Sequence, residues 1–139
     1  MFPSIRCRVK DTRADGQSNT VVGHGALGAE TGGDQNTALG GYALICNTNS
    51  NENTAIGYAS LYGNTGACNT ALGSRALQTN NGDANVAVGR DSLRLNSTGT
   101  GNVAVGAYTL DANTTASDNT AVGYFALTAN TTGASNTAV

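Results

Sequence analysis

Few side chains in this chain of 139 residues have the types and spacing that chemistry requires. His24 is the only histidine, and no nucleophile motif lies near it from which a Ser-His-Asp triad could be built. The three cysteines, Cys7, Cys46 and Cys68, include no Cys-x-x-Cys pair, and a zinc site would need further ligands. We therefore expect plain thiols, no catalytic residues, no metal site and no cofactor, and predict that the protein is not an enzyme.

Acidic residues make calcium the next ligand to consider. Asp34, Asp83 and Asp118 stand just before a recurring asparagine in three places. Calcium-binding nonapeptide repeats need an aspartate in every half-coil with Gly-Gly-x-Gly-x-Asp spacing, and the sequence lacks this pattern. The three acids are therefore interpreted as turn residues.

Aromatic side chains are candidates for surface contact. They fall at two adjacent, variable positions of the repeat described below, namely Tyr42, Tyr58, Tyr108, Tyr124 and Phe125. Rings exposed along one edge could stack on sugars or pack against a partner, so this edge is the candidate contact with a host-surface glycan or receptor. The alternative is that the rings cover a corner of the fold or lie in a seam between chains.

Three asparagines match the Asn-x-Ser/Thr acceptor sequence for glycosylation. Asn96, Asn113 and Asn130 are evenly spaced, one repeat length apart, and would line up on one edge. In a eukaryotic secretory setting they would be glycan sites. The alternative is that they are turn residues that happen to match.

These residues are positioned by one nine-residue phrase, Asn-Thr-Ala-Val-Gly-x-x-Ala-Leu, whose positions we number as columns one to nine. The phrase recurs at nearly even spacing from Asn19 onward, and its eighth copy reaches only to Val139. Self-similarity at such a short period predicts a solenoid. The column-one asparagines are Asn19, Asn36, Asn53, Asn69, Asn85, Asn102, Asn119 and Asn136.

The repeat predicts an all-β solenoid of seven to eight coils, one coil per repeat. Columns two to five are expected to form one short strand and columns seven to nine a second, because no window shows the 3.6-residue period of a helix. Stacked strands lie about 4.8 Å apart, so the column-one amides should form a ladder. Column-five glycines should mark a turn that needs positive φ or leaves no room for a side chain. They are Gly23, Gly40, Gly57, Gly73, Gly89, Gly106 and Gly123.

Large apolar residues in columns four and nine are expected to face the inside of the coil. Neighbours in a strand face opposite sides, which would turn column three, alanine in seven of eight copies, outward. A small apolar outer face and a thin core both favour association between copies. The expected core is Val22, Leu39, Ile56, Leu72, Val88, Val105 and Val122 with Leu27, Leu44, Leu61, Leu77, Leu93, Leu110 and Leu127.

Two segments divide the chain into residues 1–18 and the repeat array 19–139. The first segment does not fit the repeat and holds four of the seven positive charges. We expect it to form an N-terminal cap or lead-in strand. The alternative is a tether to a preceding domain or a neighbouring subunit. The formal net charge of −2 gives no basic excess for nucleic acid. No apolar run approaches the roughly 20 residues that a membrane span needs, so we expect no membrane insertion.

The phrase resembles repeats of known fibre proteins. Residues 119–127, followed by Asn-Thr-Thr-Gly at 130–133, resemble the repeats of bacteriophage tail-fibre proteins and related bacterial surface proteins. They are more distantly similar to the head domains of trimeric autotransporter adhesins, whose repeats are shorter. The resemblance covers residues 19–139 and implies a left-handed parallel β-roll, three chains wound about one axis, and an extracellular or virion location.

The leading hypothesis is therefore a structural, non-enzymatic segment of an extracellular or virion fibre, a homotrimer whose surface loops meet the host. The alternative is a self-assembling filament subunit whose open last half-coil, residues 136–139, accepts the first strand of the next subunit. A third hypothesis is an ice-binding solenoid. Six threonines in column two favour it, whereas Val86 and Val103 and the lack of a Thr-x-Thr row count against it.

Overall fold

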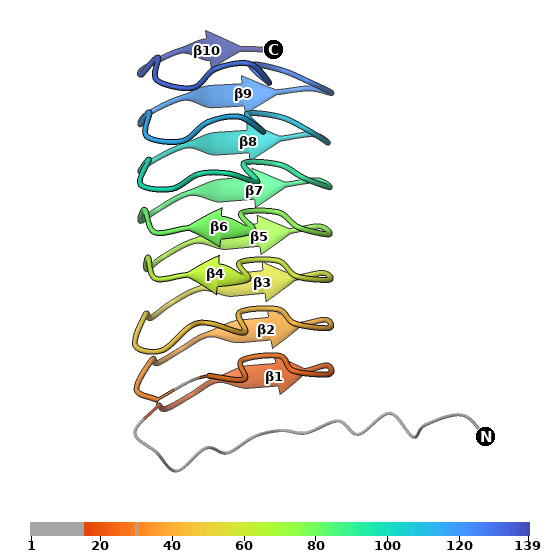
Figure 1. Cartoon of the computed structure of the whole chain (residues 1–139), viewed down its shortest axis with the longest axis vertical. Coiled ribbons are helices and arrows are strands. Elements are labelled where there is room, and N and C mark those ends of the chain that lie inside the picture. Colours follow the sequence, from red (N-terminus) through yellow and green to blue (C-terminus); the bar gives the residue numbers. More distant parts are fainter. Residues whose placement is uncertain (1–15, 30) are drawn as a thin grey trace, which may run out of the picture.

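The computed structural model describes residues 16–29 and 31–139. These residues form an all-β solenoid of about seven turns, and no helix occurs among them. The strands stack in one column, with β1 at one end and β10 at the other (Figure 1). Most of the cap expected for residues 1–18, including Cys7, lies outside the described residues.

Eight short strands, one from each copy of the phrase, form a single parallel sheet. They pair in register, so that Thr20 lies opposite Thr37 and Ala38 lies opposite Ala55. Each column of the sequence is therefore a row of equivalent side chains along the solenoid axis. The strands are β1 (Thr20–Val22), β2 (Thr37–Leu39), β3 (Thr54–Ile56), β5 (Thr70–Leu72), β7 (Val86–Val88), β8 (Val103–Val105), β9 (Thr120–Val122) and β10 (Thr137–Ala138).

A second, two-stranded parallel sheet joins β4 (Gly63–Asn64) to β6 (Thr79–Asn80). These strands belong to the coils that begin at Asn53 and Asn69, which are each one residue shorter than the other coils. The residue that these coils lack falls in the loop that follows β4 or β6. Among the described residues, the second sheet is thus confined to the two shorter coils.

Columns seven to nine form a corner instead of the expected second strand. Backbone φ is positive at both ends of this segment, for example 59° at Tyr42 and 51° at Leu44. Such angles are uncommon for bulky residues, so they would not be expected from local preferences. The corner still bonds to the next coil, because the Leu44 N–H donates to the Ser60 carbonyl at 3.0 Å.

The column-five glycines turn the chain at the end of each strand. All seven have φ between 129° and 138°. At Gly89 an added Cβ would lie 2.6 Å from the carbonyl carbon and oxygen of Gly106 in the next coil. Both the backbone angle and the close stacking of coils therefore require glycine there.

The solenoid core is built from column nine, column three and small residues of column eight. Column-nine leucines from Leu27 to Leu110 are at most 2% exposed, and Leu127 in the last complete coil is partly buried. The column-three alanines from Ala38 to Ala121 are fully buried. Alanine and leucine thus alternate across a narrow interior that also contains the asparagine ladders described next.

Candidate functional site

The column-one asparagines form a buried ladder that holds successive coils together. The backbone N–H of each asparagine donates to the side-chain oxygen of the previous one, as from Asn53 to Asn36 at 2.9 Å and from Asn102 to Asn85 at 2.9 Å. The side-chain amide reaches across the coil to a loop carbonyl, as from Asn85 to Gly99 at 2.8 Å. The ladder therefore links side chains mostly to backbone groups and satisfies buried donors that the strands leave unpaired.

This ladder determines which way each strand faces. Residues two apart in a strand share a face, so a column-one asparagine that points inward brings column three inward with it. Columns two and four then point outward. The orientation expected for columns three and four is therefore wrong, and the column-four residues are not core residues. They are Val22, Leu39, Ile56, Leu72, Val88, Val105 and Val122, each exposed or half-buried.

Columns two and four together form an outer stripe along the whole eight-stranded sheet. Leu39, Leu72 and Val122 are 44%, 45% and 38% exposed. Column two adds threonine in six copies and valine at Val86 and Val103. The outer stripe contains no charged residue in any copy, which is unusual for a long surface in contact with water.

A second asparagine ladder runs beside the first, and amides of both ladders bond the same loop carbonyl, such as that of Gly66. Asn80 donates its side-chain amide to Asn64 at 2.9 Å, and Asn96 donates to Asn80 at 2.7 Å. These asparagines follow a column-one asparagine at one fixed spacing in six successive coils, which could have revealed them in the sequence. They are Asn47, Asn64, Asn80, Asn96, Asn113 and Asn130.

The second ladder includes the three asparagines of the glycosylation sequences. Asn96 and Asn113 are fully buried, and the amide nitrogen that would carry a glycan donates two hydrogen bonds in each. The Asn130 amide also donates twice, to Asn113 at 3.3 Å and to Gly133 at 2.9 Å. In the folded coil all three nitrogens donate hydrogen bonds within the ladder, and those of Asn96 and Asn113 are too deeply buried for a glycan to be attached.

The aromatic residues of columns six and seven gather in two clusters along one corner of the solenoid. Tyr42 contacts His24 on one side and Tyr58 on the other, both edge to face, with ring centroids 5.4 and 5.9 Å apart. Further along the axis Tyr108 stacks on Phe125 at 5.0 Å, and Tyr124 meets Phe125 at 4.4 Å. Tyr58 and Tyr124 are 58% and 71% exposed, so each cluster presents a ring to solvent.

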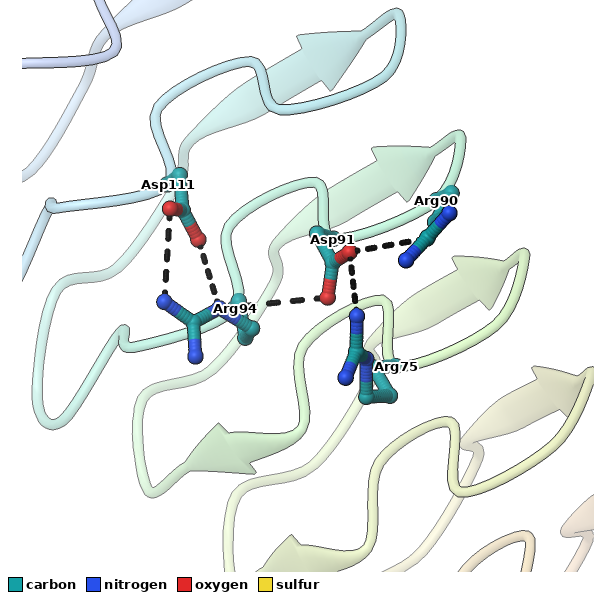
Figure 2. Close-up of polar contacts among 5 residues, drawn as sticks. All are labelled: Arg75, Arg90, Asp91, Arg94 and Asp111. Atoms are coloured by element: carbon teal, nitrogen blue, oxygen red, sulfur yellow. Dashed lines mark hydrogen bonds and ion pairs between the residues drawn. The ribbon is translucent and has the colours of Figure 1, made fainter.

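A charged cluster lies between the two aromatic clusters. The carboxylate of Asp91 accepts hydrogen bonds from Arg75 at 2.7 Å and from Arg90 at 3.1 Å, and Arg94 bonds Asp111 at 2.8 Å (Figure 2). The Arg94 Nε also lies 3.8 Å from the other oxygen of Asp91. The Asp91 hydrogen bond raises the pKa of Arg75, and the Asp111 hydrogen bond raises that of Arg94, so both remain charged.

Comparison with known proteins does not assign the chain to a family. No family model matches the chain, and no curated protein or solved structure matches it significantly.

The remaining candidates for chemistry occupy ordinary structural positions. Asp34 accepts a hydrogen bond from the Gln17 N–H at 2.6 Å, and Asp83 accepts one from the Ala67 N–H at 2.8 Å, so both acids tie loops of neighbouring coils together. Cys46 and Cys68 are free and exposed. Desolvation and a contact with Glu52 raise the pKa of the Cys68 thiol, which keeps it protonated at neutral pH.

Neither a metal-binding cluster nor a membrane-spanning helix occurs among the described residues. Within residues 16–29 and 31–139, no group of three or more His, Cys, Asp or Glu side chains is placed to hold a metal ion. The same part of the chain has no helix that is long and apolar enough to cross a membrane.

Proposed function

We propose that the chain is a structural, non-enzymatic segment of an extracellular or virion fibre in which three copies pack around a shared axis. The observation that carries this proposal is the uncharged outer stripe of columns two and four. Leu39 and Leu72 expose almost half of their surface in the single chain, and burying apolar surface contributes about 25 cal/mol per Å². The resemblance of the repeat phrase to fibre proteins supports the number of chains and the location.

The surface that supports assembly differs from the one expected from the sequence. Column three was expected to face a partner, but its alanines are buried inside the coil. Columns two and four instead offer threonine and branched apolar side chains in regular rows. Because the strands pair in register, equal rows on a second copy could pack against them along the full length of the sheet.

The test is the mass in solution, measured by light scattering over a range of protein concentrations. We expect a constant mass of three chains for the unmodified protein and of one chain for the double variant Leu72→Glu and Val105→Glu, which adds two carboxylates to the outer stripe. The control is Gln35→Glu, an exposed position outside the stripe, which should keep three chains.

Other results would overturn the trimer. A mass that rises steadily with concentration would favour the filament subunit joined end to end by strand addition. A stable single chain would contradict both kinds of assembly and leave the outer stripe free for another ligand.

The same stripe supports a second candidate function, binding to ice. Threonine of column two and a branched apolar residue of column four share one outward face in six copies, such as Thr54 with Ile56 in β3. This pairing weakens the objection that no Thr-x-Thr row exists, because the methyl and hydroxyl groups still form a flat, repeating array. Thermal hysteresis that is lost in Thr54→Lys would support it, and its absence in a single-chain protein would exclude it.

A further inference from the structure

All arginine and lysine side chains of the described residues meet at one place. Within residues 16–29 and 31–139 these are Arg75, Arg90 and Arg94, and each approaches the same carboxylate, that of Asp91. They come from two successive coils of the array and from three different positions of the repeat. The acids Asp34, Asp83 and Asp118 lie elsewhere, just before the start of the phrase.

Asp91 acts as an internal anchor that orients the arginines outward. Its side chain is 2% exposed, whereas those of Arg75, Arg90 and Arg94 are 38%, 61% and 34% exposed. Three guanidinium groups face two carboxylates, so the cluster keeps one excess positive charge at the surface. Arg90 bonds Asp91 through its Nε, and its two terminal nitrogens form no hydrogen bond with the described residues.

A contribution to folding stability is a weak explanation for the charged cluster, because the cluster is incompletely paired. The buried oxygen Oδ1 of Asp91 and the buried Nε of Arg75 have no hydrogen-bond partner. Burying charged groups that are incompletely paired usually costs more than an apolar replacement would. Elsewhere in the same column Tyr42, Tyr108 and Phe125 fill the corner with rings, so the fold does not require charges there.

The charged cluster contacts one aromatic cluster directly and lies one coil away from the other. Arg90 lies with its guanidinium carbon 5.8 Å from the centroid of the Tyr108 ring, a cation–π contact that joins the two groups. Columns six and seven repeat once per coil, so the edge from Tyr42 to Phe125 runs for about 24 Å along the axis at about 4.8 Å per coil. Exposed rings thus flank a basic centre on a straight edge, which we call the aromatic–arginine edge.

We propose that the aromatic–arginine edge binds an anionic polysaccharide laid along the solenoid axis. Sugar rings would stack on the exposed faces of Tyr58 and Tyr124, because aromatic rings pack well against the apolar faces of sugars. Carboxylate or sulfate groups of the polymer would bond the free nitrogens of Arg90 and Arg75, since guanidinium pairs with such anions in a forked geometry. The proposal names a partner for the fibre surface and rests on the proposed function only for its biological setting.

Single-stranded nucleic acid is the main competitor, because it also combines stacking rings with anions. It fits less well. Nucleic-acid-binding surfaces carry many cations and a basic isoelectric point, whereas this chain has a sequence pI of about 5.0 and three described cations, each of them bonded to an aspartate.

The experiment is titration of the intact chain with four probes at low and high salt. Heparin presents sulfates, hyaluronan presents carboxylates, dextran is neutral, and poly-dT represents single-stranded DNA. We expect binding to heparin or hyaluronan that weakens with salt, and no binding to dextran. Arg90→Gln and Tyr124→Ser should each weaken binding about tenfold, as the loss of one charged hydrogen bond or one stacking surface would.

The matched control is Gln35→Glu, which changes the net charge by the same amount as Arg90→Gln but lies outside the edge. It should leave binding unchanged, and the melting temperature of each variant checks that it folds. Equal weakening by both charge variants, tighter binding of poly-dT, or no binding to either anionic polymer would overturn the proposal. Light scattering on the same samples keeps the two proposals separate, because binding by a single chain would contradict the trimer and leave the edge intact.

Discussion

The two sides of each strand in the large sheet differ in a way that residue type alone does not suggest. The inner side has the smaller residue, alanine in column three, which is fully buried from Ala38 to Ala121. The outer side has the larger residue, and Leu39 and Leu72 expose almost half of their surface. In most sheets the larger apolar residue would face the core. Here asparagine and the column-nine leucines fill the core. The larger apolar residues of the strand therefore face outward, where they form a surface for contact.

The largest loss of stability is expected for a buried leucine, and an exposed leucine of the same coil serves as its comparison. Leu77→Ala removes a fully buried side chain and should lower the free energy of unfolding by about 2–5 kcal/mol, the usual range for such a cavity. Leu72→Ala trims an exposed side chain and should cost well under about 1 kcal/mol in the single chain. Urea unfolding of both variants measures the difference.

Protein concentration makes this comparison sharper. If other copies cover Leu72, the loss of stability in Leu72→Ala should change with protein concentration, because assembly and folding are linked. The loss in Leu77→Ala is intrinsic to the coil. Equal losses in the two variants at every concentration would contradict the assigned orientation of the strand.

The second prediction concerns the polar part of the inner side. Asn85→Ala removes the oxygen that accepts the buried Asn102 N–H at 2.9 Å, and an unpaired buried donor costs about 1–3 kcal/mol. Asn136→Ala removes a half-buried asparagine from the last rung and should cost less, because water can replace its bonds. A melting curve for each variant tests the order, and an equal drop would show that position in the ladder does not matter.

The third prediction overfills the inner side. Ala71→Leu places three extra carbon atoms where Ala71 is fully buried, and overpacking of this kind usually costs about 1–3 kcal/mol. Thr70→Leu changes the adjacent, exposed residue and should change stability by no more than about 0.5 kcal/mol. Thermal unfolding of the two variants under identical conditions gives the comparison, and a tolerated Ala71→Leu would mean that the core has unfilled space.

The smallest effect is expected on the outer surface of the charged cluster. Arg94→Gln removes an ion pair with Asp111 between side chains that are 34% and 23% exposed, together with a longer contact of 3.8 Å to Asp91. Water and salt weaken such pairs, so the loss should be under about 1 kcal/mol. Adding salt should reduce the difference between the variant and the unmodified protein, and a difference that grows with salt would contradict this assignment.

Much of the fold could be predicted from the repeat. The period, the β-solenoid and the single coil per repeat follow from the spacing of the column-one asparagines, and the structure has all three. The repeat did not reveal which residues of each strand face the core. Successive side chains point to opposite faces, so a shift of one residue exchanges the inner and outer sets. Buried Asn85 and Asn102 decide between the two, and asparagine is usually counted as a surface residue.

The candidate surfaces were predictable only in part. The variable columns locate Tyr58 and Tyr124 on one edge, because register places equivalent positions above one another. The contact of Arg94 with Asp91 depends on the shape of the corner, where Asp91 itself has a φ of 57°. Positive φ is uncommon for residues other than glycine, even though aspartate tolerates it better than most, so a prediction from the sequence could not place the cluster.

The parallel register also determines how the solenoid responds to tension. The hydrogen bonds between coils lie along the axis from β1 to β10, so a pull between these strands loads all the coil–coil interfaces in series and the weakest interface separates first (Figure 1). Each coil that detaches replaces a rise of about 4.8 Å by about 17 residues of extended chain, roughly 55–60 Å. The column would therefore lengthen in equal steps under load, absorbing mechanical energy coil by coil instead of breaking at a single point.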